Sequence, residues 1–149
     1  MADSPPIPGV HVWLVLMRAH RALSAHADQH VESLDLSCHS DFAVLEVLLH
    51  KGPLPVNAIG QKVLLASGSI TSAVDRLERR GLVERQADAS DRRVRVVALT
   101  EPGATFIRSA FATHQIAMER AASGLTADER RTLVALLKKL GRSAAKPSR

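Results

Sequence analysis

Residues 69–99, SITSAVDRLERRGLVERQADASDRRVRVVAL, decide the fold because the spacing of their apolar residues changes part-way along. Before Gly81 the apolar positions recur every three or four residues, which predicts a helix over 69–80 whose inward face is Ile70, Ala73, Val74 and Leu77. Gly81 is a typical helix stop. After it the period falls to two, so 82–87 and 94–99 are predicted strands around the charged turn 88–93. The stretch is therefore a helix that leads directly into a β-hairpin.

The residues before this stretch complete a DNA-binding motif. A short helix is predicted over 56–63, and a tight turn over 64–68 joins it to the helix from Ser69, which makes a helix-turn-helix. A further helix is predicted over 36–50, with Ser37 or Ser40 as its N-cap. With the hairpin as its wing, residues 36–103 are predicted to form a winged helix-turn-helix domain.

Helices are also predicted on both sides of this domain. One runs from Val10 to about Leu34, and another runs from Thr100-Glu101-Pro102-Gly103 to about Ser123. A capping box, Thr126 with Glu129, begins the last helix. These helices are too apolar to stand alone, so residues 1–35 and 104–149 are predicted to pack together and across a two-fold axis as a dimerisation domain. The fold class is mainly α with one small β-hairpin.

Charge is concentrated in the predicted motif. The chain has 149 residues, enough to bury a core, with 20 Lys and Arg against 15 Asp and Glu, for a net charge of +5. Between Arg76 and Arg95 there are seven arginines and four acids, so the basic excess gathers in and after the second helix of the motif. This favours a polyanionic partner, although a solvated charged surface is the simpler alternative.

Several classes of protein are excluded by the sequence. A single cysteine, Cys38, rules out an intramolecular disulfide framework and a cysteine-rich zinc site. The longest apolar run, 12–17, is too short to cross a membrane, and the start lacks a basic signal region, so we expect a cytoplasmic protein without membrane association. No phosphate loop, G-x-S-x-G or H-E-x-x-H motif is present, so neither an enzyme nor a cofactor is expected.

The predicted DNA contacts lie at the entrance and on the outer stripe of the helix after the turn, and on the hairpin. Small hydroxyl side chains let a helix lie deep in the major groove, and arginines at a hairpin tip suit the minor groove. The residues are Ser67, Gly68, Ser69, Thr71, Ser72, Arg76, Arg79, Arg92, Arg93 and Arg95. Since phosphate repels carboxylates, Asp75 and Asp91 are expected to pair with and orient Arg76 or a wing arginine, and so to brace the wing.

These residues also carry a family resemblance. The stretch 74–85, followed by Asp91-Arg92-Arg93 and by Leu99-Thr100-Glu101-Pro102-Gly103, resembles the multiple antibiotic resistance regulator (MarR) family. The resemblance implies a homodimeric transcription regulator that binds double-stranded DNA at an inverted repeat. It implies that Arg93 enters the minor groove while Asp91 braces the wing. Such proteins commonly repress a neighbouring gene and are released by a small phenolic or other aromatic ligand.

A narrower likeness concerns the effector. Residues 41–46, 50–53 and 59–71 are similar to the branch that includes methylhydroquinone-responsive regulators. The resemblance places a ligand pocket between the two parts of the protein, and the candidates to line it are His11, Trp13, Met17, His20, His39, Phe111 and His114. The alternative for His20 and His114 is a role in the core or an interface.

Other sensing modes remain open from the sequence. Cys38 is a candidate redox switch, although a structural or incidental cysteine is the alternative. His26 and His30 have the i, i+4 spacing of metal ligands, but no third ligand is evident, so no metal is predicted. A protein that coats DNA without sequence preference is the other alternative.

Overall fold

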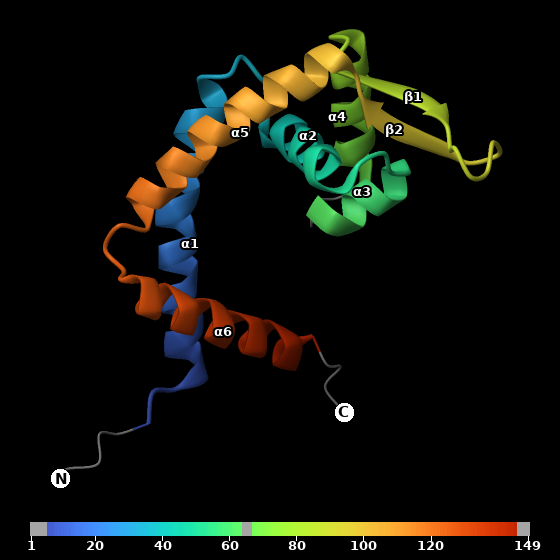
Figure 1. The fold of residues 1–149 in the computed structure, drawn as a ribbon. Helices are drawn as coiled ribbons and strands as arrows, with labels where there is room; N and C mark the ends of the chain where they lie inside the picture. Colours follow the sequence, from blue (N-terminus) through green and yellow to red (C-terminus); the bar gives the residue numbers. More distant parts are fainter. Residues whose placement is uncertain (1–5, 64–66, 146–149) are drawn as a thin grey trace.

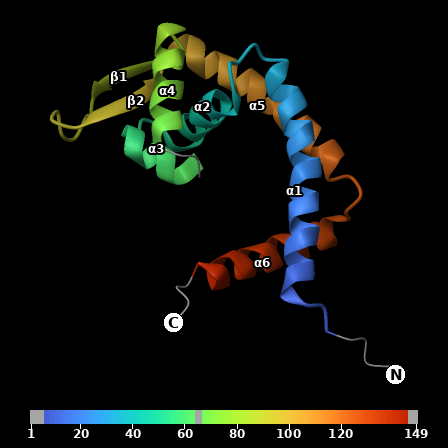
Figure 2. The same cartoon turned by 180° about the vertical axis from the view of Figure 1, so that it is seen from behind.

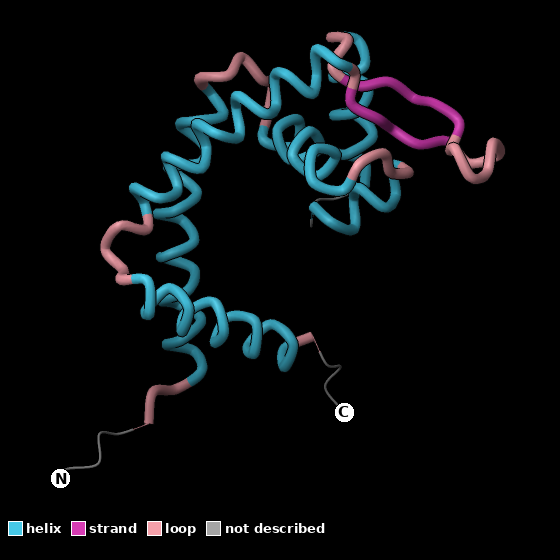
Figure 3. The backbone as a smooth tube through the Cα atoms, viewed as in Figure 1, coloured by secondary structure: helices cyan, strands magenta, loops and turns pink. Residues whose placement is uncertain are grey.

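The computed structural model describes residues 6–63 and 67–145, except for the side chains of Ser67 and Gly68. Figure 1 shows the elements in space and Figure 3 separates helices from strands. In chain order they are α1 (Gly9–Glu32), α2 (His39–Lys51), α3 (Val56–Val63), α4 (Ser67–Arg79), β1 (Val83–Ala87), β2 (Arg95–Leu99), α5 (Glu101–Ala121) and α6 (Ala127–Ala144). The predicted fold class, mainly α with one hairpin, is confirmed.

The main core lies between α2, α3, α4 and the hairpin. The predicted inward face of α4 is confirmed, because all four of its apolar residues are fully buried: Ile70, Ala73, Val74 and Leu77. From α2 and α3 they meet Val44, Leu45, Leu48 and Ile59. Ile107 and Ala110 of α5 join the same core, so α5 is fixed to the DNA-binding part as well as to α1.

The hairpin is antiparallel, with Val83 opposite Leu99 and Ala87 opposite Arg95. Val83 of β1 and residues 96–98 of β2 are buried, and the far end of the hairpin projects away from the core (Figure 1). Leu54, in the connection between α2 and α3, adds a short bridge, since its N–H and C=O both bond to Val97 at 3.1 and 2.8 Å. The wing is thus hydrogen-bonded to the connection before α3, in addition to its chain connection to α4.

The start of α5 packs directly on the end of the α4–β1 turn. Thr100 is the N-cap of α5, and its hydroxyl accepts a hydrogen bond from the Gly103 N–H at 3.1 Å. The same hydroxyl donates to the Gly81 carbonyl at 2.6 Å, and the Thr100 N–H donates to the Leu82 carbonyl at 3.1 Å. A Cβ added at Gly103 would lie 1.8 Å from the Leu82 carbonyl oxygen. Glycine is therefore required at this position for the helix to come so close.

Two predicted boundaries need correction. α2 begins at His39 with Cys38 as N-cap and no side-chain cap, so neither Ser37 nor Ser40 caps it. α4 begins at Ser67, two residues before the predicted start, and residues 64–66 of the predicted turn lie outside the described part of the chain. The capping box of Thr126 and Glu129 is present at the start of α6 as predicted.

The chain forms an open arc, with the hairpin at one end and α6 at the other (Figures 1 and 2). α1 and α5 lie side by side in both views and connect the two ends. None of residues 127–144, which make up α6, is buried, and large apolar side chains of α1 and α6 are exposed. Among the described residues, no helix has the length and apolar character needed to cross a membrane.

Candidate nucleic-acid interface

The outer face of α4 presents small hydroxyl side chains. Ser69, Thr71 and Ser72 are exposed on the first two turns, opposite the buried face that fixes the helix to the core. Arg79 is exposed near the end of the helix, and its Nε donates to the Asp75 carbonyl oxygen at 3.2 Å. Ser67 and Gly68 lie in the first turn of α4, but their side chains are outside the described part. This face has the shape and chemistry of a major-groove reading surface.

Arg76 does not share this open position. Its Nη2 donates to Asp41 Oδ1 of α2 at 2.6 Å, and its Nε lies 3.2 and 3.3 Å from the two carboxylate oxygens. Nη2 also contacts Ser40 Oγ at 3.2 Å and Cys38 Sγ at 2.8 Å. The hydrogen bond to Asp41 is the main reason that the pKa of Arg76 is raised above its ordinary value. Arg76 is therefore paired with Asp41 of α2 and not with Asp75 or Asp91, and its contact with DNA stays a prediction.

Asp75 pairs with a wing arginine, one of the two partners expected for it. Its Oδ1 accepts a hydrogen bond from Arg85 Nη2 of β1 at 2.5 Å, and Arg85 also pairs with Glu78 of α4. The hydrogen bond to Asp75 is the main cause of the raised pKa of Arg85. Because both acids are on α4 and Arg85 is on β1, this cluster fixes the direction of the wing relative to the helix.

The wing tip is shaped by two aspartates. Asp88 Oδ1 accepts hydrogen bonds from the N–H groups of Ser90 and Asp91 at 2.7 and 3.1 Å. The Ser90 hydroxyl also donates to Asp88 Oδ1. These hydrogen bonds lower the pKa of Asp88, and the one from the Ser90 hydroxyl contributes most. Asp91 Oδ1 accepts from the Arg93 N–H at 3.0 Å and from Arg93 Nε at 3.3 Å. The tip therefore has a defined turn without any buried side chain to support it.

The wing arginines extend into solvent from this turn. The Arg93 side chain is 92% exposed even though it contacts Asp91, and Arg92 and Arg95 are also exposed. These three arginines lie at the projecting end of the hairpin, beyond the acids of α4. The structure thus presents a basic tip beside the polar face of α4, as a protein that reads both grooves would need.

A small pocket lies between α1, α2 and α5, and Val63 of α3 also lines it. Its volume is about 250 Å³. The lining is mixed, with two histidines, one carboxylate and an aromatic ring among aliphatic side chains: Ala27, Val31, His39, Phe42, Ala43, Glu46, Val63 and His114. His39 Nε2 lies 2.7 Å from Asp28 Oδ1 at the exposed edge. An engineered apolar cavity of about 150 Å³ holds benzene, so this space suits one substituted ring.

His114 is the one pocket residue with a buried, unpaired side-chain nitrogen among the residues that the structure describes. Its Nδ1 is buried and has no hydrogen-bond partner among the residues that the structure describes. Burial is the main cause of its lowered pKa, because a buried site disfavours the charged form of the ring. Its ring centre lies 5.0 Å from that of Phe42 and 5.5 Å from that of His30, whose Nε2 is 3.0 Å from the Ala110 carbonyl oxygen. The unsatisfied nitrogen is available to a ligand.

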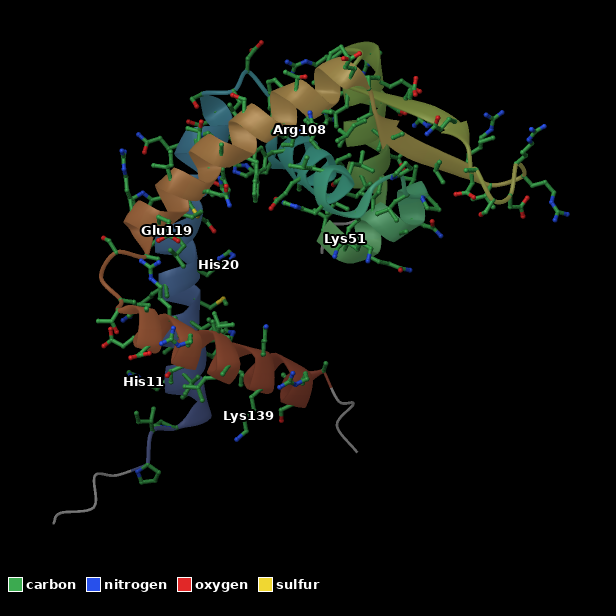
Figure 4. The ribbon with its side chains drawn as sticks, in the orientation of Figure 1. His11, His20, Lys51, Arg108, Glu119 and Lys139 are labelled. Atoms are coloured by element: carbon green, nitrogen blue, oxygen red, sulfur yellow. The ribbon has the colours of Figure 1, made fainter. Side chains whose placement is uncertain are left out.

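The seven predicted pocket residues do not come together in one place. His39 and His114 line the pocket, and the Phe111 ring centre is 6.5 Å from that of His114. His11 and His20 instead line a separate apolar groove of about 610 Å³ with Leu133 and Leu137 of α6. Figure 4 labels His11 and His20 on the part of α1 remote from the hairpin. Trp13 and Met17 are exposed on that same part, so a single pocket with all seven residues is wrong for this chain.

The two other sensing candidates differ in their surroundings. Cys38 is exposed at the N-cap of α2, with Sγ 2.8 Å from Ser40 Oγ, and its redox role stays a prediction. His26 has no metal-binding cluster around it, since no group of three His, Cys, Asp or Glu side chains suited to a metal occurs in the described ranges.

Sequence reasoning missed Asp41, Glu46 and Arg85. Asp41 is a fully buried carboxylate in the first turn of α2, and an acid within an otherwise apolar inward face was the available signal. Glu46 and Arg85 are charged residues at positions where the helix or strand pattern predicts exposure to solvent. The sequence therefore carries no signal that they belong to the site.

Comparison with known proteins identifies the family. The profile described as the MarR family matches residues 39–94. The chain is 39% identical over 133 residues to the HTH-type transcriptional regulator MhqR of Bacillus subtilis, a match that covers 89% of this chain and 91% of that protein. The chain belongs to the MarR family. It is therefore a DNA-binding transcription regulator with a winged helix, as the sequence resemblance implies.

Solved MarR-family structures share the whole arrangement. The crystal structure of a mutant MarR from E. coli complexed with operator DNA has a TM-score of 0.68 and 28% identity, covering 89% of this chain and 91% of that one. The PcaV transcriptional regulator from Streptomyces coelicolor, in complex with its natural ligand, has a TM-score of 0.67 and 25% identity, covering 97% and 98%. The likeness thus extends beyond the winged helix to the flanking helices.

Proposed function

We propose that this MarR-family protein is a homodimeric repressor that binds an inverted-repeat operator and is released by a small phenolic or quinone-like ligand. The proposal rests on two features of one chain: the exposed Arg93 at the wing tip, and the hydroxyl-rich outer face of α4. Two such units related by a two-fold axis would read half-sites about one duplex turn apart, within roughly 16 to 20 base pairs. Residues 36–103 make up the DNA-binding part in this proposal.

The dimer is supported by the apolar surface at the other end of the arc. Exposed large apolar side chains gather on α1 and α6, among them Val12, Trp13, Val15, Leu133, Val134, Leu136 and Leu140. A monomer rarely exposes so much contiguous apolar surface to water. Residues 1–35 and 104–149 therefore fit a second copy of the chain, with α6 as the helix that most needs a partner.

Replacing Arg93 by alanine is expected to weaken operator binding by more than about tenfold, because it removes a minor-groove cation at the fixed wing tip. Fluorescence anisotropy with labelled operator and with scrambled DNA measures the effect. The matched control is Arg120→Ala, which removes the same charge from the exposed last turn of α5.

If Arg93→Ala binds as tightly as the parent while Arg120→Ala does too, the wing does not insert into DNA. A loss shared equally by both variants would show that only the total charge matters.

The pocket lining favours a ligand whose ring carries hydroxyl or carbonyl groups over a ligand whose ring carries a carboxylate. Glu46 lines the pocket beside His114, so an anionic ligand would meet a negative charge, whereas a phenolic hydroxyl can donate to Glu46. A second oxygen on the ring could then form a hydrogen bond with His114 Nδ1, and Phe42 and Val31 supply apolar lining for the ring itself. Filling this space would act on α2 and α5 together, since both contribute to it.

Replacing His114 by phenylalanine is expected to raise the hydroquinone concentration needed to release operator DNA by about threefold to tenfold, which is the usual worth of one hydrogen bond. The ring volume and apolar contacts are retained. Titration of the protein–operator complex with hydroquinone measures the change, and His26→Phe on the exposed face of α1 serves as control. Unchanged release by His114→Phe would place the effector elsewhere.

A further inference from the structure

We propose that Arg76 is a positioning residue, which acts on operator binding through the buried Asp41 carboxylate by fixing α4 on α2. The proposal rests on the operator binding proposed above. It assigns the Asp41–Arg76 pair a role in reading DNA although neither side chain needs to contact a base.

The geometry of the pair supports a fixed link. Asp41 is 0% exposed in the first turn of α2, where a negative charge also suits the helix dipole. Both of its oxygens lie within 3.3 Å of Arg76 Nε, and Oδ1 is 2.6 Å from Nη2. Such a two-sided contact with a planar guanidinium restricts both distance and direction, which a lysine ammonium would not do.

Arg76 lies on the same side of α4 as two serines that are predicted to contact DNA. Ser72 is one turn before Arg76, and Ser69 is nearly two turns before it, so all three lie along one side of the helix. The buried residues Ile70 and Leu77 determine which side of α4 faces the core, while a hydrogen bond adds a requirement on direction that apolar contacts do not have. The polar link to Asp41 is what sets how far along and at what rotation Ser69 and Ser72 are presented.

The same contacts argue against a phosphate-binding role for Arg76. Its Nε and Nη2 are engaged with Asp41, Ser40 and Cys38, and its side chain is 27% exposed. Arg79, one turn later, is exposed on the same helix and donates to a carbonyl oxygen in its own helix. The two arginines therefore differ in their surroundings: Arg76 is paired with α2, whereas Arg79 is exposed on the surface of α4.

The test compares Arg76→Lys, Arg76→Gln, Asp41→Asn and the double variant Asp41→Asn/Arg76→Lys, with Arg120→Lys on the exposed last turn of α5 as the matched control. Operator and scrambled DNA affinities are measured over a range of salt, after circular dichroism has shown the parent's helix content. Lysine keeps a charge for phosphate but loses the fork to Asp41. We expect each single variant to lose about tenfold in the ratio of operator to scrambled affinity, with an unchanged salt slope. The double variant should be no weaker than the weaker single variant.

Different results overturn the proposal. If Asp41→Asn binds like the parent, or if losses in the two single variants add fully in the double variant, Arg76 acts independently of Asp41. If Arg76→Gln lowers the salt slope by about one while Asp41→Asn does not, Arg76 contacts a phosphate directly. Should one variant fail to fold, the other still decides through its selectivity and salt slope. If the parent itself prefers no operator, the proposed function fails together with this role, whereas a binding parent and a parent-like Asp41→Asn reject this role alone.

Discussion

The double variant Leu133→Glu/Leu137→Glu is expected to be a monomer that binds operator DNA about a hundredfold more weakly than the parent, because two linked half-site contacts become one. Both leucines are substantially exposed in the single chain, at 43% and 39%, on a helix without a buried residue. In a dimer their apolar faces are removed from water, and two carboxylates there would be buried without partners. Analytical ultracentrifugation and operator binding measure the two effects.

A charge-matched control comes from the opposite face of α6. Helical spacing of about 100° per residue places Ala135 and Arg131 away from the leucines. Ala135→Glu with Arg131→Gln changes the net charge by the same amount and is expected to stay dimeric. If the leucine variant remains a dimer of parental affinity, α6 is not the interface between copies.

Gly103→Ala is expected to lower the free energy of unfolding by about 3 kcal/mol, at the upper end of the usual cost of overpacking. The added Cβ would lie 1.8 Å from the Leu82 carbonyl oxygen, and the clash is with backbone, which no side-chain rotation relieves. Thr100 holds both segments in place through its bonds to Gly81, Leu82 and Gly103. Thermal unfolding should show a midpoint roughly 6 to 12 °C lower.

The control for this substitution is Gly141→Ala in α6, where an added Cβ meets nothing within 4 Å. In an open helical position the change should stabilise by about 0.5–1 kcal/mol. Equal stability of Gly103→Ala and the parent would mean that α5 does not pack on Leu82 as closely as the structure shows.

Local patterns in the sequence predicted the helices and the hairpin because each depends on neighbours in the chain. The spacing of Ile70 and Leu77 alone defines the buried side of α4, and Thr126 with Glu129 defines the start of α6. The bridge between Leu54 and Val97 had no such signal, since it arises only when the connection after α2 meets the wing.

The candidate site could be predicted only where exposure follows from the local pattern. Arg93 at a charged turn is exposed in the structure, whereas Arg76, on a stripe that helical spacing assigns to solvent, meets Asp41, 35 positions earlier. The prediction of one pocket failed because α1 is long: His11 lies 16 residues, or about 24 Å of rise, before Ala27, the first residue of α1 that lines the pocket. His114 joins His39 only because α5 packs against α1 and α2.

The central claim is operator-specific binding that an aromatic ligand reverses. The most direct measurement is binding of the purified protein to the intergenic DNA beside its own gene and to scrambled DNA, across salt, with and without hydroquinone. We expect the protein to prefer the intergenic DNA at physiological salt and to lose this preference when hydroquinone is added. Equal affinity for scrambled DNA would contradict it in favour of a protein that coats DNA, and specific binding that ignores hydroquinone would contradict the proposed effector class.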